Sequence, residues 1–388
     1  MNKFDKDYLQ LVRKILSEGV EVQNTTGINT IKIPSYNFEF DLSREFPILQ
    51  SKQTFYKHAI IEMLWIWQMQ SNDVRDLHAR GVHIWDDWMI DEDGIYRIYE
   101  PIGTCEYDPN KEVVVMDPLS VPISDPFGKR TPMKAKCDDS GKVMMARSIK
   151  PGRTIKAAKY FGKDMAYTIG KAYGFYTNRF EMTQDTIYTI KNNPTDRRMV
   201  NNLWQNEFLR EAVLPSCVYG TEWDVTSGKL NLQVHQRSCD VPLCLPFDVT
   251  QYATFLKMMA QVTELEPGTI SYSIKDAHIY VNQIEGMKEM VRREDMYNSL
   301  SHRSASDLLA YKHFLQKQLF KLNKDSDEYK KLDSDIRIID MIIEPTTPEL
   351  ELDSSVTDFF EFDNSKELKH VKLKKYKHMG KIDFPLAQ

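Results

Sequence analysis

The chain has 388 residues, with 51 Lys and Arg against 56 Asp and Glu, so its formal net charge is −5. At about 100–200 residues per domain, this length allows one large or two medium domains, and the near balance of charge excludes a protein whose whole surface binds polyanions. No apolar run approaches the roughly 18 residues of a membrane span, and the first residues lack the apolar core of a signal peptide. The five cysteines, at irregular spacings, form neither a disulfide framework nor a zinc-binding CxxC pair. We therefore expect a cytoplasmic protein with no metal, membrane or nucleic-acid partner.

Two helices are predicted near the start of the chain. Apolar residues recur at helical spacing from Phe4 to Ile15, and Gly19 follows where such a helix would end. Residues 53–69 are apolar almost all round, which is typical of a deeply buried helix. Glu62 is the only acid in this second helix, so a carboxyl group is expected inside the core.

The pattern changes at residues 89–165, where short strand-like pieces such as EVVVMD are broken by Pro, Gly and Asp. We predict a small β-rich insertion there. Residues 229–237 alternate apolar and polar side chains, as a half-buried strand does. Residues 250–265 return to helical spacing before Pro267-Gly268, and residues 269–274 alternate as another strand.

Two late segments are strongly charged. Residues 299–352 contain leucines and isoleucines spaced for two helices around the polar turn NKDSDE, which predicts a helical-hairpin insertion. The segment 366–377 is rich in lysine. A basic run of this kind can bind nucleic acid, but we favour a solvated strand face.

Several polar residues between 196 and 280 could carry chemistry. Cys217 ends the motif LPSC, and taken alone it is either a buried small side chain or a nucleophile. Arg197 and Arg198 follow the turn NPTD, where paired guanidinium groups form either a solvated face or a phosphate clamp. A further polar set stands at the ends of apolar segments: Gln236, Arg237, Ser238, Asp240, Asp248, Asp276, His278 and Tyr280. Each of these residues, considered singly, is more often structural than functional.

The order of these motifs resembles that of the thymidylate synthases and their pyrimidine hydroxymethylase relatives. The diagnostic block is QRSCDVPLCLPFDVTQYA, with LPSC upstream and DAHIYVNQIE downstream. FPILQSKQ, EMLWIWQMQSNDVRDLHARGVHIWDDW, IGKAYGFY and NPTDRR match further segments of the family. The resemblance implies an α/β (α+β) fold in which helices flank a mixed sheet. Its catalytic core would span residues 1–88, 166–298 and 353–388, with residues 89–165 and 299–352 as insertions.

The resemblance also implies roles for individual residues. The catalytic set would be Cys217 as the nucleophile, Glu62 for proton transfers, Asp248 and Tyr173. The nucleotide would be bound by Arg197, Arg198, Gln236, Arg237, Ser238, Asp240, His278 and Tyr280. The one-carbon donor would be 5,10-methylenetetrahydrofolate, held by Lys52, Trp85, Trp88 and Asp240. A symmetric homodimer is implied, in which Arg197 and Arg198 cross to the partner's site.

Elementary chemistry agrees with these roles. The C5 atom of a pyrimidine is a poor nucleophile, and addition of a thiolate at C6 turns the ring into an enamine that attacks a one-carbon electrophile. We expect Arg237 to favour the thiolate of Cys217. We also expect burial to raise the pKa of Glu62, which suits it to proton transfer.

Asp248 departs from the thymidylate synthases, which have asparagine at this position. An amide matches the N3–H donor and O4 acceptor of uracil, whereas a protonated carboxyl matches the N3 acceptor and N4 amino donor of cytosine. The related deoxycytidylate hydroxymethylases carry aspartate here. We therefore expect folate-dependent hydroxymethylation of dCMP at C5, a reaction that would suit a bacteriophage modifying its DNA in the host cytoplasm. The structural alternative for Asp248 is a cap on a helix that starts near Thr250.

Other departures keep alternatives open. Val218 stands where thymidylate synthases have histidine, and Thr25 stands near where they have a phosphate-binding arginine, which Lys52 or an insertion residue would replace. Trp85 is retained, although a tryptophan beside the cofactor can shield the intermediate from water. The alternatives are a dCMP 5-methylase, a thymidylate synthase acting on dUMP, and a hydroxymethylase of dUMP or CMP. A binding protein on an inactive fold of this family is a different class, which the retained catalytic side chains argue against.

Overall fold

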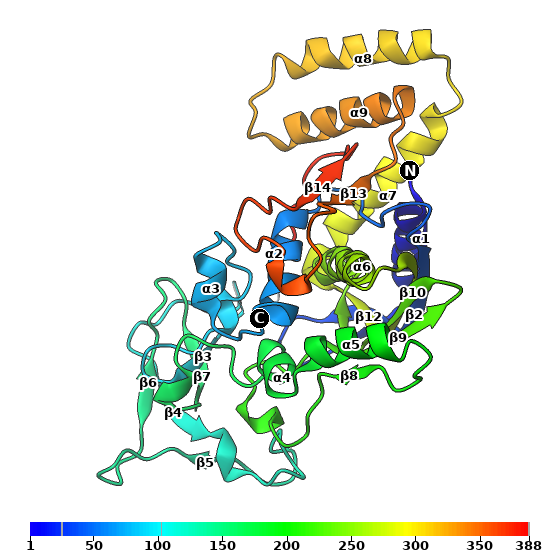
Figure 1. Ribbon diagram of the computed structural model, residues 1–388. Helices are drawn as coiled ribbons and strands as arrows, with labels where there is room; N and C mark the ends of the chain where they lie inside the picture. Colours follow the sequence, from blue (N-terminus) through cyan, green and yellow to red (C-terminus); the bar gives the residue numbers. More distant parts are fainter. Residues whose placement is uncertain (25, 102, 387–388) are drawn as a thin grey trace.

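A large mixed sheet, with helices packed on one of its faces, is the main β structure of the computed structural model, which describes residues 1–24, 26–101 and 103–386 (Figure 1). Within these residues the sheet has seven strands in the order β1-β2-β12-β10-β9-β8, with β11 paired to β12. β12 is antiparallel to β2 and parallel to β10 and β11. The strands are β1 (Val20–Val22), β2 (Thr30–Asp41), β8 (Val200–Asn202), β9 (Val218–Thr226), β10 (Lys229–Gln236), β11 (Cys239–Asp240) and β12 (Glu266–Tyr280). The expected α/β fold with a mixed sheet is therefore present.

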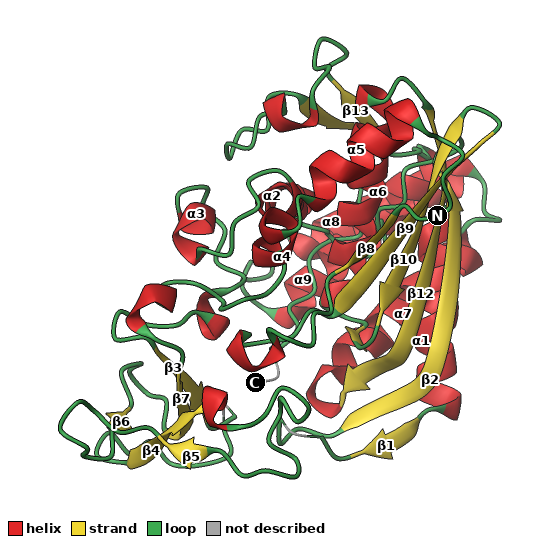
Figure 2. Cartoon of the chain, turned by 60° about the horizontal axis from the view of Figure 1, so that its bottom comes forward, coloured by secondary structure: helices red, strands yellow, loops and turns green. Residues whose placement is uncertain are grey.

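The two faces of the sheet differ in chemistry because side chains alternate along each strand. Leu232 and Val234 of β10, with Tyr272 of β12, point into the core and are buried. Their neighbours Gln233 and Ser273 lie on the other face, where the amide of Gln233 donates to the hydroxyl of Ser273 at 3.0 Å. This polar face is turned toward the viewer in Figure 2, with the helices behind it.

Helix α1 (Lys3–Glu18) covers part of the apolar face, as its spacing predicts. Its N-terminus is capped by Asn2, whose side chain accepts a hydrogen bond from the backbone of Asp5. The helix ends at Gly19, where a Cβ atom would lie only 2.3 Å from the carbonyl oxygen of Ile15. Glycine is thus required at this point by close packing.

Helices α2 (Tyr56–Trp67) and α6 (Cys244–Val262) form the centre of the molecule. α2 is buried along most of its length, as expected from its apolar sequence. The ring of Trp67 stacks on Phe255 of α6 with centroids 4.8 Å apart. This packing fixes the positions of the polar residues that the two helices carry.

Two predicted boundaries in this region were wrong. α6 begins at Cys244, six residues before position 250, because Pro246 lies in its first turn, where a missing N–H is tolerated. Asp248 is therefore inside the helix, whose N-cap is Leu243, and the capping alternative for Asp248 is excluded. β12 begins at Glu266, so Pro267 is part of the strand and does not separate it from the helix.

Residues 89–165 contain a second, smaller sheet with its own apolar cluster. Its strands are β3 (Ile95–Tyr99), β4 (Glu112–Asp117), β5 (Lys134–Ala135), β6 (Met145–Arg147) and β7 (Ile155–Tyr160), in the order β3-β7-β4-β5 with β6 on β4. The buried residues of the cluster are Ile95, Val115, Ala146, Ile155 and Ala158. The β-rich character predicted for this segment is confirmed.

The predicted helical hairpin consists of α8 (Ala305–Leu319) and α9 (Asp327–Ile343), which extend from the end of α7 (Ile284–Leu300) (Figure 1). Leu308, Leu315 and Ile339 form the cluster between them. Leu309, which the spacing placed with this apolar set, is 53% exposed on the outer side of α8.

The basic segment near the C-terminus forms strand β14 (Val371–Lys374), which pairs with β13 (Glu349–Leu352). Lys374 lies 2.5 Å from Glu351, and Lys375 lies 2.8 Å from Glu349. The lysine charges thus face an acidic strand, which favours the solvated strand face over a polyanion site.

The remaining helices connect the elements described above, and α4 and α5 contribute buried residues to the core. They are α3 (Val74–His78), α4 (Gly174–Arg179) and α5 (Met182–Asn192), with 3-10 turns at Asp86–Trp88, Pro118–Ser120, Lys163–Met165, Leu209–Glu211, Val281–Gln283 and Phe359–Glu361. Among the described residues, no helix combines the length and apolar character needed to cross a membrane.

Candidate active site

Most of the predicted site residues gather where β10, β11 and β12 end against α2 and α6. Gln236 ends β10, Asp240 ends β11, and the backbone of Asp240 is paired with that of His278 on β12. Asp248 projects from the second turn of α6, and Glu62 lies in the middle of α2. The strand ends and the two helices therefore bring together residues that are far apart in the sequence, and we place the predicted substrate pocket among these residues.

Cys217 lies immediately before β9 and is partly exposed. The guanidinium Nη2 of Arg237 is 4.0 Å from its Sγ and also donates to the carbonyl of Pro215 at 2.7 Å, while Nε donates to that of Ser216. Burial raises the pKa of the Cys217 thiol, Arg237 opposes the rise, and Asp248 adds to it. The expectation that Arg237 favours the thiolate is correct in direction, but burial outweighs it and the free protein holds a thiol.

Tyr173 holds the backbone of the segment that carries Cys217. Its hydroxyl accepts a hydrogen bond from the backbone N–H of Cys217 at 2.8 Å. Its φ of 46° lies in a region that non-glycine residues seldom occupy, a strain that is common at functional positions. The side chain is buried against the ring of Trp85, with centroids 5.6 Å apart.

Glu62 is held by two neutral donors. The indole N–H of Trp85 donates to Oε1 at 2.5 Å, and the amide of Gln251 donates to Oε2. Burial raises the pKa of Glu62 to about 7, although both hydrogen bonds act in the opposite direction. This carboxyl group can therefore gain and lose a proton near neutral pH, as required of a proton-transfer group.

Asp248 is the end of a buried hydrogen-bond chain. The hydroxyl of Tyr272 donates to Oε1 of Gln236 at 2.8 Å, and Nε2 of Gln236 donates to Oδ2 of Asp248, also at 2.8 Å. Burial raises the pKa of Asp248 to about 8, and the charge of Glu62 raises it further while Gln236 lowers it. Asp248 thus carries a proton at neutral pH, with Gln236 already satisfying one of its oxygens.

The residues expected near the sugar form a second polar group. Nδ1 of His278 lies 3.1 Å from Oδ1 of Asp276, and Lys32 holds the other oxygen of that carboxylate at 2.5 Å. The hydrogen bond to His278 and the contact with Lys32 lower the pKa of Asp276 to about 2. The rings of His278 and Tyr280 meet edge to face with centroids 5.2 Å apart. His278 and Tyr280 are thereby held side by side.

The residues expected on the cofactor side contact Glu62 through Trp85 and lie near Asp240 through Lys52. The ammonium of Lys52 donates to the carbonyl of Pro242 at 2.6 Å and lies over the ring of Phe384 at 5.0 Å. Burial lowers the pKa of Lys52 to about 8, while Asp240 opposes this shift. Trp88 packs edge to face on Trp85, with centroids 5.6 Å apart. Trp85 and Trp88 thus form an aromatic pair, and Lys52 is a buried cation near Asp240.

Asp240 lies near residues of both groups, because its backbone pairs with that of His278 and its charge acts on Lys52. It accepts from the backbone N–H of Leu243 and from the amide of Gln283, both at 3.1 Å, and burial raises its pKa. Ser238 is half-buried between Arg237 and the buried Cys239. Both residues lie on the stretch that links β10 to α6.

Arg197 and Arg198 are not brought to this pocket within the chain. They lie in the exposed loop between α5 and β8, where Arg198 pairs with Asp196 at 2.8 Å. This placement is compatible with a role in a partner's site. Thr25, where the family's phosphate-binding arginine is replaced, lies outside the described residues.

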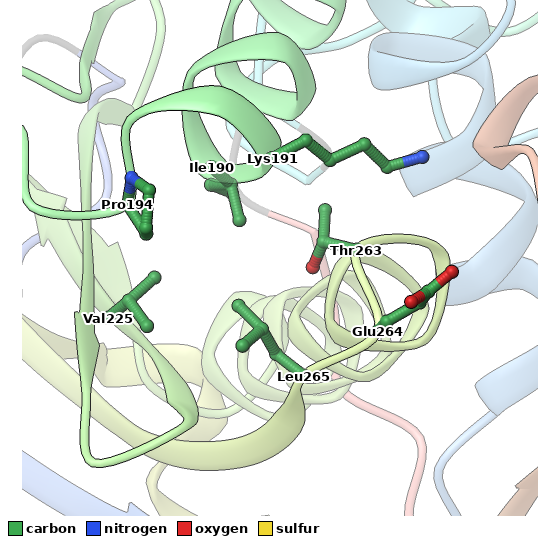
Figure 3. Close-up of a pocket in the computed structure, with 7 residues that line it drawn as sticks. All are labelled: Ile190, Lys191, Pro194, Val225, Thr263, Glu264 and Leu265. Atoms are coloured by element: carbon green, nitrogen blue, oxygen red, sulfur yellow. The ribbon is translucent and has the colours of Figure 1, made fainter.

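A hollow of about 380 Å³ lies apart from this pocket (Figure 3). Its lining contains none of the predicted site residues: Ile190, Lys191, Pro194, Val225, Thr263, Glu264 and Leu265. Figure 3 shows these side chains coming from the end of α5, from β9 and from the end of α6. We assign the chemistry to the carboxyl and thiol groups and not to this hollow.

Sequence reasoning missed Gln251 and Tyr272. Gln251 stands one helical turn after Asp248, so its spacing within α6 could have placed both on one face. Tyr272 looked like an ordinary inward residue of an alternating strand, and only the structure shows that its hydroxyl reaches Gln236.

Comparisons with known proteins agree with this geometry. The family profile described as thymidylate synthase matches residues 6–320. A thymidylate synthase of Clostridium beijerinckii is 34% identical over 300 residues, which cover 77% of this chain and 86% of the relative. Thymidylate synthase 1 of Bacillus subtilis is 30% identical over 313 residues, covering 76% and 85%. The solved structure of thermostable thymidylate synthase A from Bacillus subtilis aligns with a TM-score of 0.61 at 27% identity, over 99% of both chains.

The fold and these matches define a one-carbon transferase. The chain belongs to the thymidylate synthase family, whose members take their one-carbon unit from 5,10-methylenetetrahydrofolate, bind a nucleoside monophosphate and are typically dimeric. The matched range includes residues 89–165. The division of the chain into a compact core and two insertions stays a prediction.

The contacts of Glu62 lead to a first prediction. Replacing Gln251 by methionine removes one of the two donors that lower the pKa of Glu62, so the ionisation near pH 7 moves to higher pH in the kcat profile. Gln261→Met is the matched control, because Gln261 lies on the same helix and donates to backbone carbonyls of Asp353 and Val356 at the surface. An unchanged profile in Gln251→Met would contradict the role of this hydrogen bond.

Proposed function

We propose that the protein transfers a one-carbon unit from 5,10-methylenetetrahydrofolate to C5 of dCMP. The observation that carries this proposal is Asp248, a carboxyl group whose pKa is raised to about 8. It lies in the pocket with Glu62 and the thiol of Cys217, at the position where thymidylate synthases have asparagine. The choice of substrate therefore depends on what this acid can donate and accept.

A protonated Asp248 complements cytosine. Its proton is available to the N3 acceptor, and an oxygen is available to the N4 amino group. Gln236 supports this arrangement because its amide is fixed by Tyr272 and approaches Asp248 only as a donor. As the thiolate adds to the ring, Asp248 can pass its proton to N3 and offset the developing charge. One residue would thus both select the base and assist the addition.

The other residues have roles that follow from their contacts. The thiol of Cys217 releases its proton to water, and the thiolate, stabilised by the guanidinium of Arg237, forms the bond to C6. Glu62 accepts or returns protons at its pKa of about 7. Tyr173 holds the backbone of Cys217 and so positions the sulfur. His278 and Tyr280 present polar groups to the sugar side.

The cofactor side of the pocket fits a folate. Trp85 and Trp88 offer flat apolar surfaces, Asp240 offers a carboxyl group to the amino and ring N–H groups of a pterin, and Lys52 offers a positive charge to a glutamate tail. These residues would hold 5,10-methylenetetrahydrofolate, which supplies an electrophilic carbon when bound.

The product depends on whether the transferred exocyclic carbon is attacked by water or reduced by hydride. Attack by water yields the hydroxymethyl group expected from the sequence, and hydride transfer yields a methyl group with dihydrofolate. Trp85 is buried and tied to Glu62 beside the pocket, which favours exclusion of water and therefore the methyl product. Val218 lacks a polar group beside the base and favours neither ending.

The second candidate is thymidylate synthesis from dUMP. It is favoured by the names of the two relatives and the solved structure reported above, all of which are thymidylate synthases. A neutral carboxyl can also face uracil if it accepts from N3–H and donates to O4. Incubation with dCMP, dUMP and CMP plus the folate, with products identified by mass, separates the candidates.

We further propose a symmetric homodimer in which Arg197 and Arg198 bind the phosphate in the partner's site. The polar face of the sheet, with its row of half-buried side chains including Gln233, His235 and Ser273, supports a second copy on this side. The exposed loop carrying both arginines supports a role outside their own chain.

Replacing Asp248 by asparagine tests the base assignment. The amide has no acid proton for N3, so kcat/KM for dCMP falls by at least about 10²-fold while activity with dUMP appears or rises, since one or two mispaired buried hydrogen bonds cost about 1–3 kcal/mol each. Asp139→Asn, an exposed carboxyl-to-amide change, is the control and leaves the ratio unaltered. An unchanged dCMP-to-dUMP ratio in Asp248→Asn would sink the dCMP proposal.

The pH dependence provides an independent test. Asp248 is active as the protonated acid, and this form is present below its pKa of about 8 and lost as the pH rises through it. The loss of this acid offsets the gain in Cys217 thiolate as the pH rises, so we expect kcat/KM for dCMP to stop rising above about pH 8. A profile that keeps rising through pH 9, as thiolate formation alone predicts, would contradict an acid role for Asp248.

Mixed dimers test the crossing arginines. Cys217→Ser lacks the nucleophile, and the double variant Arg197→Ala/Arg198→Ala lacks the phosphate ligands, so each homodimer is inactive or nearly so. Random mixing of equal amounts restores about a quarter of the wild-type sites if the arginines act in the partner's site, because half of the dimers then contain one intact site. If subunit exchange is verified and no activity is recovered, the arginines serve the site of their own chain.

A further inference from the structure

Two histidines and one aspartate form a cluster beside the tryptophans of the pocket. His78 ends α3, His83 lies in the following loop, and Asp86 begins the 3-10 turn that leads to Trp88. We call these three residues the His-Asp cluster. It has no part in the proposed reaction, and the sequence pattern predicted no metal site in this protein.

The three side chains converge on one small volume. Nε2 of His78 is 2.6 Å from Oδ1 of Asp86, and Nδ1 of His83 is 3.2 Å from Oδ2. The imidazole rings stack with centroids 4.8 Å apart at an angle of 26°. One ligand atom from each residue lies within 4.8 Å of the other two.

This donor set has the chemistry of a transition-metal site. Imidazole nitrogen and carboxylate oxygen are standard zinc ligands, whereas calcium and magnesium prefer oxygen alone. Ligands held about 2.0 Å from a tetrahedral ion are about 3.3 Å apart. The contact of His78 with Asp86, at 2.6 Å, would therefore open slightly, and the widest pair of ligand atoms, within 4.8 Å, would close. His83, whose side chain is 62% exposed, is free to make this movement.

We propose that the His-Asp cluster is a binding site for Zn²⁺, with water completing the coordination shell. The side chains of His78 and Asp86 are 31% and 43% exposed, which gives an ion and its water access from solvent.

The location gives such an ion a structural effect. Trp85, directly before Asp86, donates to Glu62, and Trp88 packs on Trp85. An ion that ties α3 to Asp86 restrains the segment on which both tryptophans lie. Bound Zn²⁺ therefore raises the melting temperature of the protein, since it binds the folded chain and the unfolded chain lacks the preformed cluster.

The test is titration of EDTA-treated, reduced protein with Zn²⁺ by calorimetry at pH 7.5, together with the absorption spectrum of the Co²⁺-loaded protein. We expect one ion per chain, a higher melting temperature, and a cobalt spectrum without the intense charge-transfer band of thiolate ligands. This last readout excludes binding at the partly exposed Cys217 or at the exposed cysteines, which are Cys105, Cys137 and Cys244. A thiolate band would overturn the proposal.

Variants locate the ion. His83→Ala and Asp86→Asn should each weaken Zn²⁺ binding at least about tenfold. Two controls should keep wild-type affinity: His313→Ala removes an exposed histidine of α8, and Asp87→Asn removes the neighbouring carboxylate, which pairs with Lys150. Melting of each variant in EDTA verifies that it is folded. Wild-type affinity in His83→Ala or Asp86→Asn, or an equal loss in Asp87→Asn, would overturn the assignment.

Discussion

The burial of two carboxyl groups among neutral donors is the constraint on which the site depends. A buried carboxylate without hydrogen bonds costs several kcal/mol, and such a group takes up a proton to avoid this penalty. Here Glu62 receives an indole N–H and an amide, and Asp248 receives an amide. None of these donors is a cation. The acids are therefore held in place while their pKa values stay near neutrality, where an arginine partner would have lowered both.

The scaffold keeps these two acids at a fixed separation. Glu62 and Asp248 belong to different helices, α2 and α6, whose contact is made by large rings such as Trp67 and Phe255. Close-packed side chains deform little, so neither acid can relax away from the other. Since the charge of Glu62 raises the pKa of Asp248, a proton gained or lost at one site changes the balance at the other. The proposed acid in base recognition and the proposed proton-transfer acid are thus coupled.

Apolar periodicity was sufficient to predict most helices and strands, but it did not predict which side chains contact one another. The helix from Phe4 to Ile15 and the strand at 229–237 were found because one face of each is continuously apolar. The start of α6 was placed too late because Leu245-Pro246-Phe247 lacks polar residues that would show a helical period. That error alone kept the capping alternative for Asp248 open.

The site shows the same limit in its electrostatics. Motif resemblance grouped Cys217, Glu62, Gln236, Asp248 and His278 as parts of one site, and this grouping stays a prediction. The sign of the effect of Arg237 on Cys217 followed from charge alone, but the opposing effect of burial depends on packing that no local pattern contains. The hydroxyl of Tyr272 was missed for the same reason, because its partner Gln236 lies 36 residues away.

The pairing of β2 with β12 has a consequence for how the chain folds. The ion pair between Lys32 and Asp276, on these adjacent strands, joins residues 244 positions apart. During synthesis β2 emerges early and can pair only with the short β1, so its other edge stays open until β12 has been made. Such non-local pairing slows folding and exposes an apolar strand edge in the meantime. The nascent chain is therefore most vulnerable to aggregation before residue 280 leaves the ribosome, and its yield should depend on chaperones that protect that edge.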